Sequence, residues 1–265
     1  MKTCLTALNT ATSPFAPGST VSPTSATVTN ALNALCADSV ANACPEATIR
    51  TQVTNFFSAC PAELNDKVPG VITLYDTMYT MGPMRTAVCS KDDSGSWCAM
   101  SSAVSSREVG EGVAGSSMDL AHLLALLYTN NGAALKRRAE VPAIVPNMTT
   151  FHDTNLPFLF FKPDLDATKL CTTCARNVLT AYINFESNCP YAPGLGNSQL
   201  LDTQAALYNA VKDKCPDNFL TGALQAAGGL SSGFGSRSAA VSKATSGFTT
   251  LAAGTVALVA VFFSL

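Results

Sequence analysis

The stretch Leu170–Pro190, LCTTCARNVLTAYINFESNCP, predicts a helix with cysteines at both ends. Its apolar residues recur at the three- and four-residue spacing of one helical face: Val178, Leu179, Tyr182 and Ile183. Cys171 and Cys174 precede the helix, and Cys189-Pro190 stops it, because proline cannot continue an α-helix. We interpret the segment as a helix whose end is held by a disulfide bridge and which is followed by a partner helix.

The first half of the chain repeats this pattern. Asn55–Pro61 matches Asn184–Pro190 at five of seven positions. Each copy also has two cysteines before the helix and one after the next helix: Cys36, Cys44 and Cys89 in the first copy, and Cys171, Cys174 and Cys215 in the second. The sequence therefore predicts a mainly α fold of disulfide-stapled helical hairpins in two duplicated units. Chance resemblance between the two halves is the alternative.

Apolar spacing predicts further helices along the chain. They are Ile49–Phe57 behind Pro45, Val71–Tyr79 ending before Gly82-Pro83, Met118–Tyr128, and Leu200–Val211. Only Leu156–Phe161 resembles a strand, and Pro157 restricts it to an edge or to an extended packing segment. Thr10–Thr29 is rich in Ser, Thr and Pro, which predicts an extended segment open to O-glycosylation.

All ten cysteines are expected to form disulfides, since an oxidising secretory compartment accounts for so many of them: Cys4, Cys36, Cys44, Cys60, Cys89, Cys98, Cys171, Cys174, Cys189 and Cys215. They divide into six and four, so each half could close its own bridges. Hairpin geometry pairs Cys215 with Cys171 or Cys174, and Cys89 with Cys36 or Cys44. Cys60 and Cys189 need partners outside their own helices, and Cys4 is a candidate for Cys60.

The C terminus predicts a glycosylphosphatidylinositol (GPI) attachment signal. Phe248–Leu265 is uncharged, and a run of small residues, Ser231–Ala240, precedes it. Ser238 fits best as the attachment residue, with Ser232 and Ser236 as competitors. A transmembrane anchor and a buried core helix are the alternatives, but the tail is short and diluted by Thr, Gly and Ser. A GPI-anchored protein must enter the secretory pathway, yet Leu5–Pro14 lacks the apolar core of a signal peptide. Either the chain is truncated at its start, which we expect, or the interpretation of the tail is wrong.

We therefore divide the chain into five segments. In order, they are a Ser/Thr/Pro-rich N-terminal segment (1–30), a first disulfide-rich helical unit (31–104), a linker with one apolar helix and the dibasic site Lys136–Arg138 (105–150), a second disulfide-rich helical unit (151–228), and a linker with the GPI-attachment signal (229–265).

The segments Leu170–Phe185 and Val88–Cys98, the small-residue tail and the cysteine layout together resemble an uncharacterised family of basidiomycete fungal cell-surface proteins. The resemblance covers most of the chain from about Ala31 onward. It implies a secreted, lipid-anchored fungal protein and carries no known activity, so no catalytic residue is transferred. In a fungal secretory pathway, Lys136–Arg138 is a candidate for cleavage by a kexin-like protease; a solvated charge cluster is the alternative.

No motif specifies a catalytic, metal or cofactor site. Gly110–Gly115 and Gly229–Gly233 match glycine-rich motifs but lack the strand and helix contexts that those motifs need. His122 and His152 lie far apart without ligand spacing. The pair Cys171–Cys174 could be a redox motif, but structural bridges are favoured. A formal net charge of −2 without a large basic block argues against nucleic acid as a partner.

Two surface features remain. Asp92, Asp93 and Trp97 lie between Cys89 and Cys98 and are candidate carbohydrate contacts, because sugars stack on tryptophan and paired acids hydrolyse glycosides. Adjacent aspartates in a turn, pointing apart, are the alternative. The sequon Asn147-Met148-Thr149 predicts an N-glycan on Asn147.

The sequence thus predicts a lipid-anchored protein of the fungal cell surface or cell wall without identifiable catalytic activity. It would lie on the extracellular face of the plasma membrane or in the wall, with the membrane as its partner and a wall polysaccharide or an apolar ligand as a further candidate. The first alternative is a carrier that holds an apolar ligand, a lipid or sterol, in a helical pocket. The second is a carbohydrate-binding or hydrolytic surface protein.

Overall fold

The computed structural model describes residues 2–16, 19, 21, 24–101, 128–130 and 144–221. Several sequence predictions lie outside these residues: the helix over 118–127, both glycine-rich motifs, His122, the dibasic site, Ser238 and the C-terminal tail. Among the described residues, no helix is long and apolar enough to span a bilayer.

The described part of the chain is mainly α-helical, as predicted. The helices of the first half are α1 (Lys2–Thr12), α2 (Ser25–Leu35), α3 (Asp38–Ala43), α4 (Glu46–Ala59), α5 (Pro61–Asn65), α6 (Pro69–Val88) and α7 (Cys98–Ser101), with a short 3-10 helix η1 (Ser13–Phe15). Those of the second half are α9 (Met148–Thr154), α10 (Ala167–Leu170), α11 (Thr173–Asn188) and α12 (Gln204–Lys214), with 3-10 helices η2 (Leu156–Phe158) and η3 (Leu195–Asn197).

One small antiparallel sheet lies between the two halves of the chain in sequence order. Strand β1 (Tyr128–Asn130) pairs with β2 (Ile144–Pro146), and Thr129 lies opposite Val145. The predicted helix over Met118–Tyr128 is therefore wrong at its last residue, which belongs to a strand. Three β-residues are too few to leave an alternating pattern that sequence reasoning could detect.

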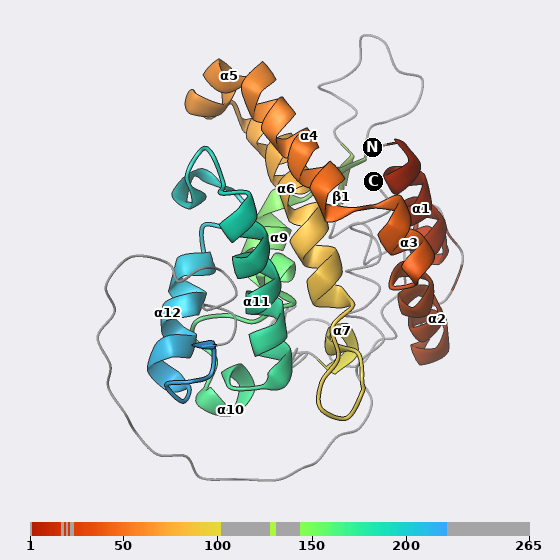
Figure 1. Cartoon of the computed structure of the whole chain (residues 1–265), viewed down its shortest axis with the longest axis vertical. Coiled ribbons are helices and arrows are strands. Elements are labelled where there is room, and N and C mark those ends of the chain that lie inside the picture. Colours follow the sequence, from red (N-terminus) through yellow and green to blue (C-terminus); the bar gives the residue numbers. More distant parts are fainter. Residues whose placement is uncertain are drawn as a thin grey trace.

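Helix α6 is the central element of the fold. It packs against both α4 and α11, and α1 packs against α2 and α3 at the edge of the molecule (Figure 1). The helix was predicted to end before Gly82-Pro83, but it continues to Val88 with Pro83 inside it. Proline costs a backbone hydrogen bond there. Burial of Met84, Ala87 and Val88 beyond it outweighs that loss.

Much of the described part of the N-terminal segment is helical, contrary to the prediction from its composition. Helix α1 buries Cys4, Leu8 and Ala11 along one face, and Phe15 follows them into the core. Helix α2 begins after Thr24, whose side chain accepts from Thr27 N–H in a capping box. The spacing of apolar residues along one helical face, rather than the overall Ser and Thr content, determines the secondary structure of this segment.

The segment Leu156–Phe161, predicted as a strand, is instead a compact turn. It begins with η2, and Leu159 and Phe160 both have positive φ angles of 49° and 66°. All six residues are buried. A strand exposes alternate side chains to opposite faces, whereas this turn points every one of its apolar groups into the core.

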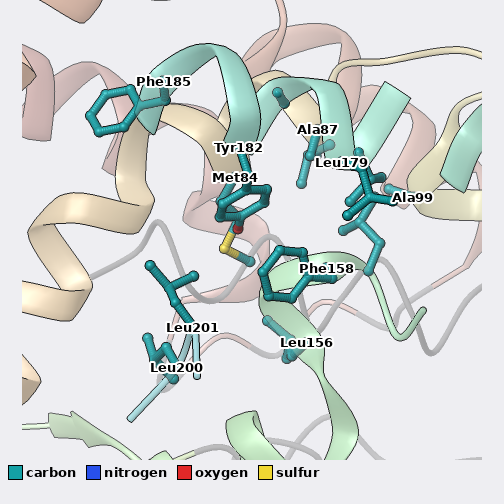
Figure 2. Close-up of a cluster of buried hydrophobic side chains, with 14 of the residues drawn as sticks. Met84, Ala87, Ala99, Leu156, Phe158, Leu179, Tyr182, Phe185, Leu200 and Leu201 are labelled. Atoms are coloured by element: carbon teal, nitrogen blue, oxygen red, sulfur yellow. The ribbon is translucent and has the colours of Figure 1, made fainter. Parts of the chain in front are cut away.

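The two halves share a single core. Figure 2 shows Leu179, Tyr182 and Phe185 of α11 beside Met84 and Ala87 of α6, with side chains of the Leu156–Phe158 turn and of Leu200–Leu201 completing the cluster. Leu200 and Leu201, predicted to begin the last helix, lie in the turn that precedes α12. Helices from both predicted units therefore bury their apolar faces against one another.

Four disulfides staple the described helices: Cys4–Cys44, Cys36–Cys89, Cys98–Cys174 and Cys171–Cys215. The hairpin pairings predicted for Cys89 and Cys215 are confirmed. The suggested Cys4–Cys60 pairing is wrong, because α1 packs beside α3 and brings Cys4 to Cys44. The prediction of self-contained halves is also wrong, since Cys98–Cys174 joins them.

Cys60 and Cys189 are free thiols, so the expectation that every cysteine is bridged is wrong for these two. Cys189 lies in the electrostatic field of Glu46 and Arg50 at the start of α4, whereas Cys60 follows the last residue of that helix. The ten-residue stretch between Arg50 and Cys60 spans about 15 Å. A bridge requires Cα atoms roughly 4.4–6.8 Å apart, which is why these two thiols do not bond to each other.

Candidate functional site

The loop Ser90–Cys98, the predicted carbohydrate site, is a small hairpin fastened to the start of α11. Lys91 and Trp97 form an isolated antiparallel bridge at its base. The Asn177 side-chain amide donates to the Lys91 carbonyl oxygen (3.0 Å), and Cys98 is bonded to Cys174. These contacts fix the position of the loop against the second half of the chain.

The two acids of this loop do not face a common site. Asp92 Oδ1 accepts hydrogen bonds from Ser94 N–H (2.9 Å), Ser94 Oγ (2.6 Å) and Ser96 N–H (2.9 Å). The Ser94 hydroxyl is the main reason that the pKa of Asp92 is lowered. Asp93 Oδ2 instead accepts from Thr173 Oγ1 (2.6 Å) on α11. Each carboxylate holds the loop in shape, so the pair is not arranged for glycoside hydrolysis.

Trp97 is half-buried and packs against the core. The Lys91 ammonium lies 4.2 Å from the centre of its ring, a cation–π arrangement that covers one face of the ring. The structure therefore brings Asp92, Asp93 and Trp97 into one loop, and a sugar contact there stays a prediction.

Sequence reasoning missed a buried polar cluster around Asp76 of α6. The Asp76 side chain is 0% exposed. Its carboxylate accepts from Tyr191 Oη (2.5 Å), Ser198 Oγ (2.8 Å) and the Gln199 N–H (2.7 Å). Burial raises the pKa of Asp76, and these hydrogen bonds partly oppose the rise. Because solvent does not reach the carboxylate, the cluster fixes the Tyr191–Leu201 turn to α6 rather than offering a reactive group.

His152 joins α9 to the turn before α12. Its Nδ1 lies 3.0 Å from Asp153 Oδ1, and its Nε2 lies 3.2 Å from Asp202 Oδ1. The hydrogen bond to Asp153 is the main cause of a raised His152 pKa, and Asp202 adds to it. Both ring nitrogens have carboxylate partners, so neither is free to act as a general base. Among the described residues, no group of three or more His, Cys, Asp and Glu side chains could hold a metal.

Asn147, the predicted glycosylation site, caps the N terminus of α9. Its Oδ1 accepts from the Thr150 N–H at 3.3 Å. Asn147 is half-buried and Thr149 is exposed. The Asn147 side chain would thus carry the glycan on its nitrogen while its oxygen caps the helix.

A cavity of about 180 Å³ lies between α11 and α12. Its lining is mostly apolar, with Gln204 as a buried polar side chain. Pockets for drug-sized ligands measure roughly 300–1,000 Å³. This cavity is accordingly too small for the lipid or sterol of the carrier hypothesis.

Comparisons of the chain with protein-family models, with curated proteins and with solved structures found no match.

Proposed function

We propose that this chain is a secreted cell-surface protein, held at the outer face of the membrane by a lipid attached near its C terminus, and that its helical domain is a structural or binding module rather than an enzyme. The observation that carries the proposal is the set of four disulfides. Such bridges persist in oxidising, extracellular compartments and are rare in a reducing cytosol.

The chemistry of the described side chains favours a module without catalysis. The acids Asp76, Asp92 and Asp93 all accept hydrogen bonds that hold the fold together. His152 is engaged at both ring nitrogens. Catalysis needs a nucleophile or base that can reach a substrate, and these groups are committed to neighbouring side chains and backbone.

The anchor is tested by expressing the chain in a fungal host behind a restored signal peptide. We expect a phosphatidylinositol-specific phospholipase to release the protein from membranes, and mass spectrometry to find its C terminus at Ser238. A variant ending at Ser238, which lacks the tail, should be secreted into the medium without the enzyme. Persistence of the tail in the mature protein would refute the proposal.

The glycan predicted on Asn147 gives a second test of passage through the secretory pathway. Thr149→Ala removes the sequon and leaves the Asn147 cap of α9 in place. We expect the wild-type chain, but not this variant, to shift on a gel after endoglycosidase treatment. Equal mobility of treated and untreated wild-type protein would mean that Asn147 is unmodified.

A further inference from the structure

The cavity between α11 and α12 has walls that come from three elements. Figure 1 shows the two helices as neighbours on one side of the molecule. Leu179 and Ile183 lie one helical turn apart on α11, and Leu195 belongs to η3. Helix α12 supplies the remaining lining residues, which are Gln204, Ala205, Tyr208 and Asn209. Three aliphatic side chains thus form one wall and the start of α12 forms the other.

Gln204 gives this cavity a polar contact. It is only 7% exposed, and its Nε2 donates to Glu186 Oε2 at 2.7 Å. This hydrogen bond fixes the orientation of the amide, because only the nitrogen can donate to a carboxylate. Among the described residues, none donates to the Gln204 side-chain oxygen. That oxygen is not one of the described buried side-chain atoms that lack a hydrogen-bond partner, so a ligand that supplies a donor there takes the place of water.

We propose that the cavity binds one small, uncharged ring compound whose single O–H or N–H group donates to the Gln204 oxygen. The size of the cavity sets the size of the ligand, since an apolar cavity of about 150 Å³ holds one benzene molecule. The apolar lining selects a hydrocarbon body, and the nearby Glu186 carboxyl disfavours an anion. This site differs from the sterol or lipid pocket expected of a carrier, and it does not depend on the membrane anchor.

The experiment uses p-cresol and anisole as probes. The two are isomers, both carry one aromatic ring, and only p-cresol can donate a hydrogen bond. We expect methyl NMR signals of the purified full chain to shift on addition of p-cresol at Leu179, Ile183 and Leu195, with weaker shifts for anisole. Equal responses to both probes would overturn the role of Gln204, and no shift up to the solubility limit of p-cresol would overturn the site.

A pair of substitutions on α12 locates the binding. Ala205 is exposed at the rim of the cavity, so Ala205→Leu fills the entrance while sparing the core. Ala206 is also exposed but does not line the cavity, which makes Ala206→Leu the matched control. We expect Ala205→Leu to weaken p-cresol binding by about tenfold through steric clash and Ala206→Leu to leave it unchanged. Equal binding by both variants would place the probe elsewhere. Phospholipase release remains a separate readout, so failure here leaves the proposed anchoring unaffected.

Discussion

At the scale of single residues, buried polar side chains hold together segments that are distant in sequence. Asp76 binds the Tyr191–Leu201 turn, and the Tyr79 hydroxyl donates to the Cys189 carbonyl oxygen at 2.6 Å. The Tyr182 hydroxyl likewise donates to the Pro157 carbonyl oxygen. Each contact satisfies a backbone or side-chain group that would otherwise be buried without a partner. These residues position the turns between helices, whereas apolar packing positions the helices themselves.

We expect Asp76→Ala to lower the free energy of unfolding by about 3 kcal/mol, since three donors lose their buried acceptor. The raised pKa of Asp76 indicates that the carboxylate itself is costly to bury, so the loss is smaller than three full hydrogen bonds. Tyr191→Phe removes only one donor and should cost about 1 kcal/mol. Urea denaturation measures both. A similar stability for Asp76→Ala and the wild type would show that the cluster is dispensable.

The His152 contacts predict a small pH dependence of stability. A histidine whose folded pKa is raised above the ordinary value of 6.5 stabilises the fold fully below that value and loses its contribution as the pH rises through the folded pKa. The side chain is 38% exposed, so solvent screening keeps the effect below about 1 kcal/mol. His152→Gln should therefore destabilise the protein more at acidic than at alkaline pH in urea unfolding. An equal loss under both conditions would contradict the assigned ion pairs.

At the scale of elements, α6 is packed closely enough to limit which residues it can contain. A Cβ atom added at Gly82 would lie 2.9 Å from Phe185 Cε2 and 3.2 Å from Cδ2. That ring is buried and makes an edge contact with Tyr79, with the ring centroids 5.0 Å apart. Glycine thus sets how near α6 and α11 approach each other.

We expect Gly82→Ala to destabilise the protein by about 1–3 kcal/mol, because a rigid buried ring must move to admit the methyl group. Gly70 lies in the first turn of the same helix, and nothing would meet a Cβ there within 4 Å. Gly70→Ala should be neutral or slightly stabilising, because alanine favours helices over glycine. Thermal unfolding of the two variants tests the comparison. A stability gain at Gly82 would show that α6 and α11 can separate at low cost.

At the scale of the whole molecule, one bridge connects the two halves of the chain. Cys98–Cys174 spans 76 residues and fastens the Ser90–Cys98 hairpin to α11. Cys36–Cys89 and Cys171–Cys215 each close a shorter loop within one half. The bridge therefore restrains the chain across the interface between α6 and α11, which apolar packing already buries.

Replacing both Cys98 and Cys174 with serine should lower the free energy of unfolding by about 2–4 kcal/mol, since the unfolded chain regains the freedom of a long loop. Cys60→Ser is the control for the loss of a thiol without a bridge, and we expect it to change stability by less than about 1 kcal/mol. Guanidinium denaturation under non-reducing conditions compares them. Equal stability of the double variant and the control would mean that packing alone joins the halves.

The sequence by itself determined the helices and part of their connectivity. Apolar spacing located α4 and α11, because the residues that a helix buries on one face lie three and four positions apart in the sequence. The order of cysteines around a helical hairpin then predicted that Cys89 pairs with Cys36 or Cys44, and Cys215 with Cys171 or Cys174. Both features are local, so they survive without knowledge of how the helices pack.

Only the tertiary structure decided the rest. Pro83 stays inside α6, and Leu156–Phe161 forms a buried turn instead of a strand, because contacts from other helices outweigh local preference. The partners of Asp76 lie more than a hundred residues away, and the Gln204 cavity requires α11 and α12 to be placed side by side. Such contacts leave no periodic trace in the sequence, since they depend on which helical faces meet when one core is buried from both halves of the chain.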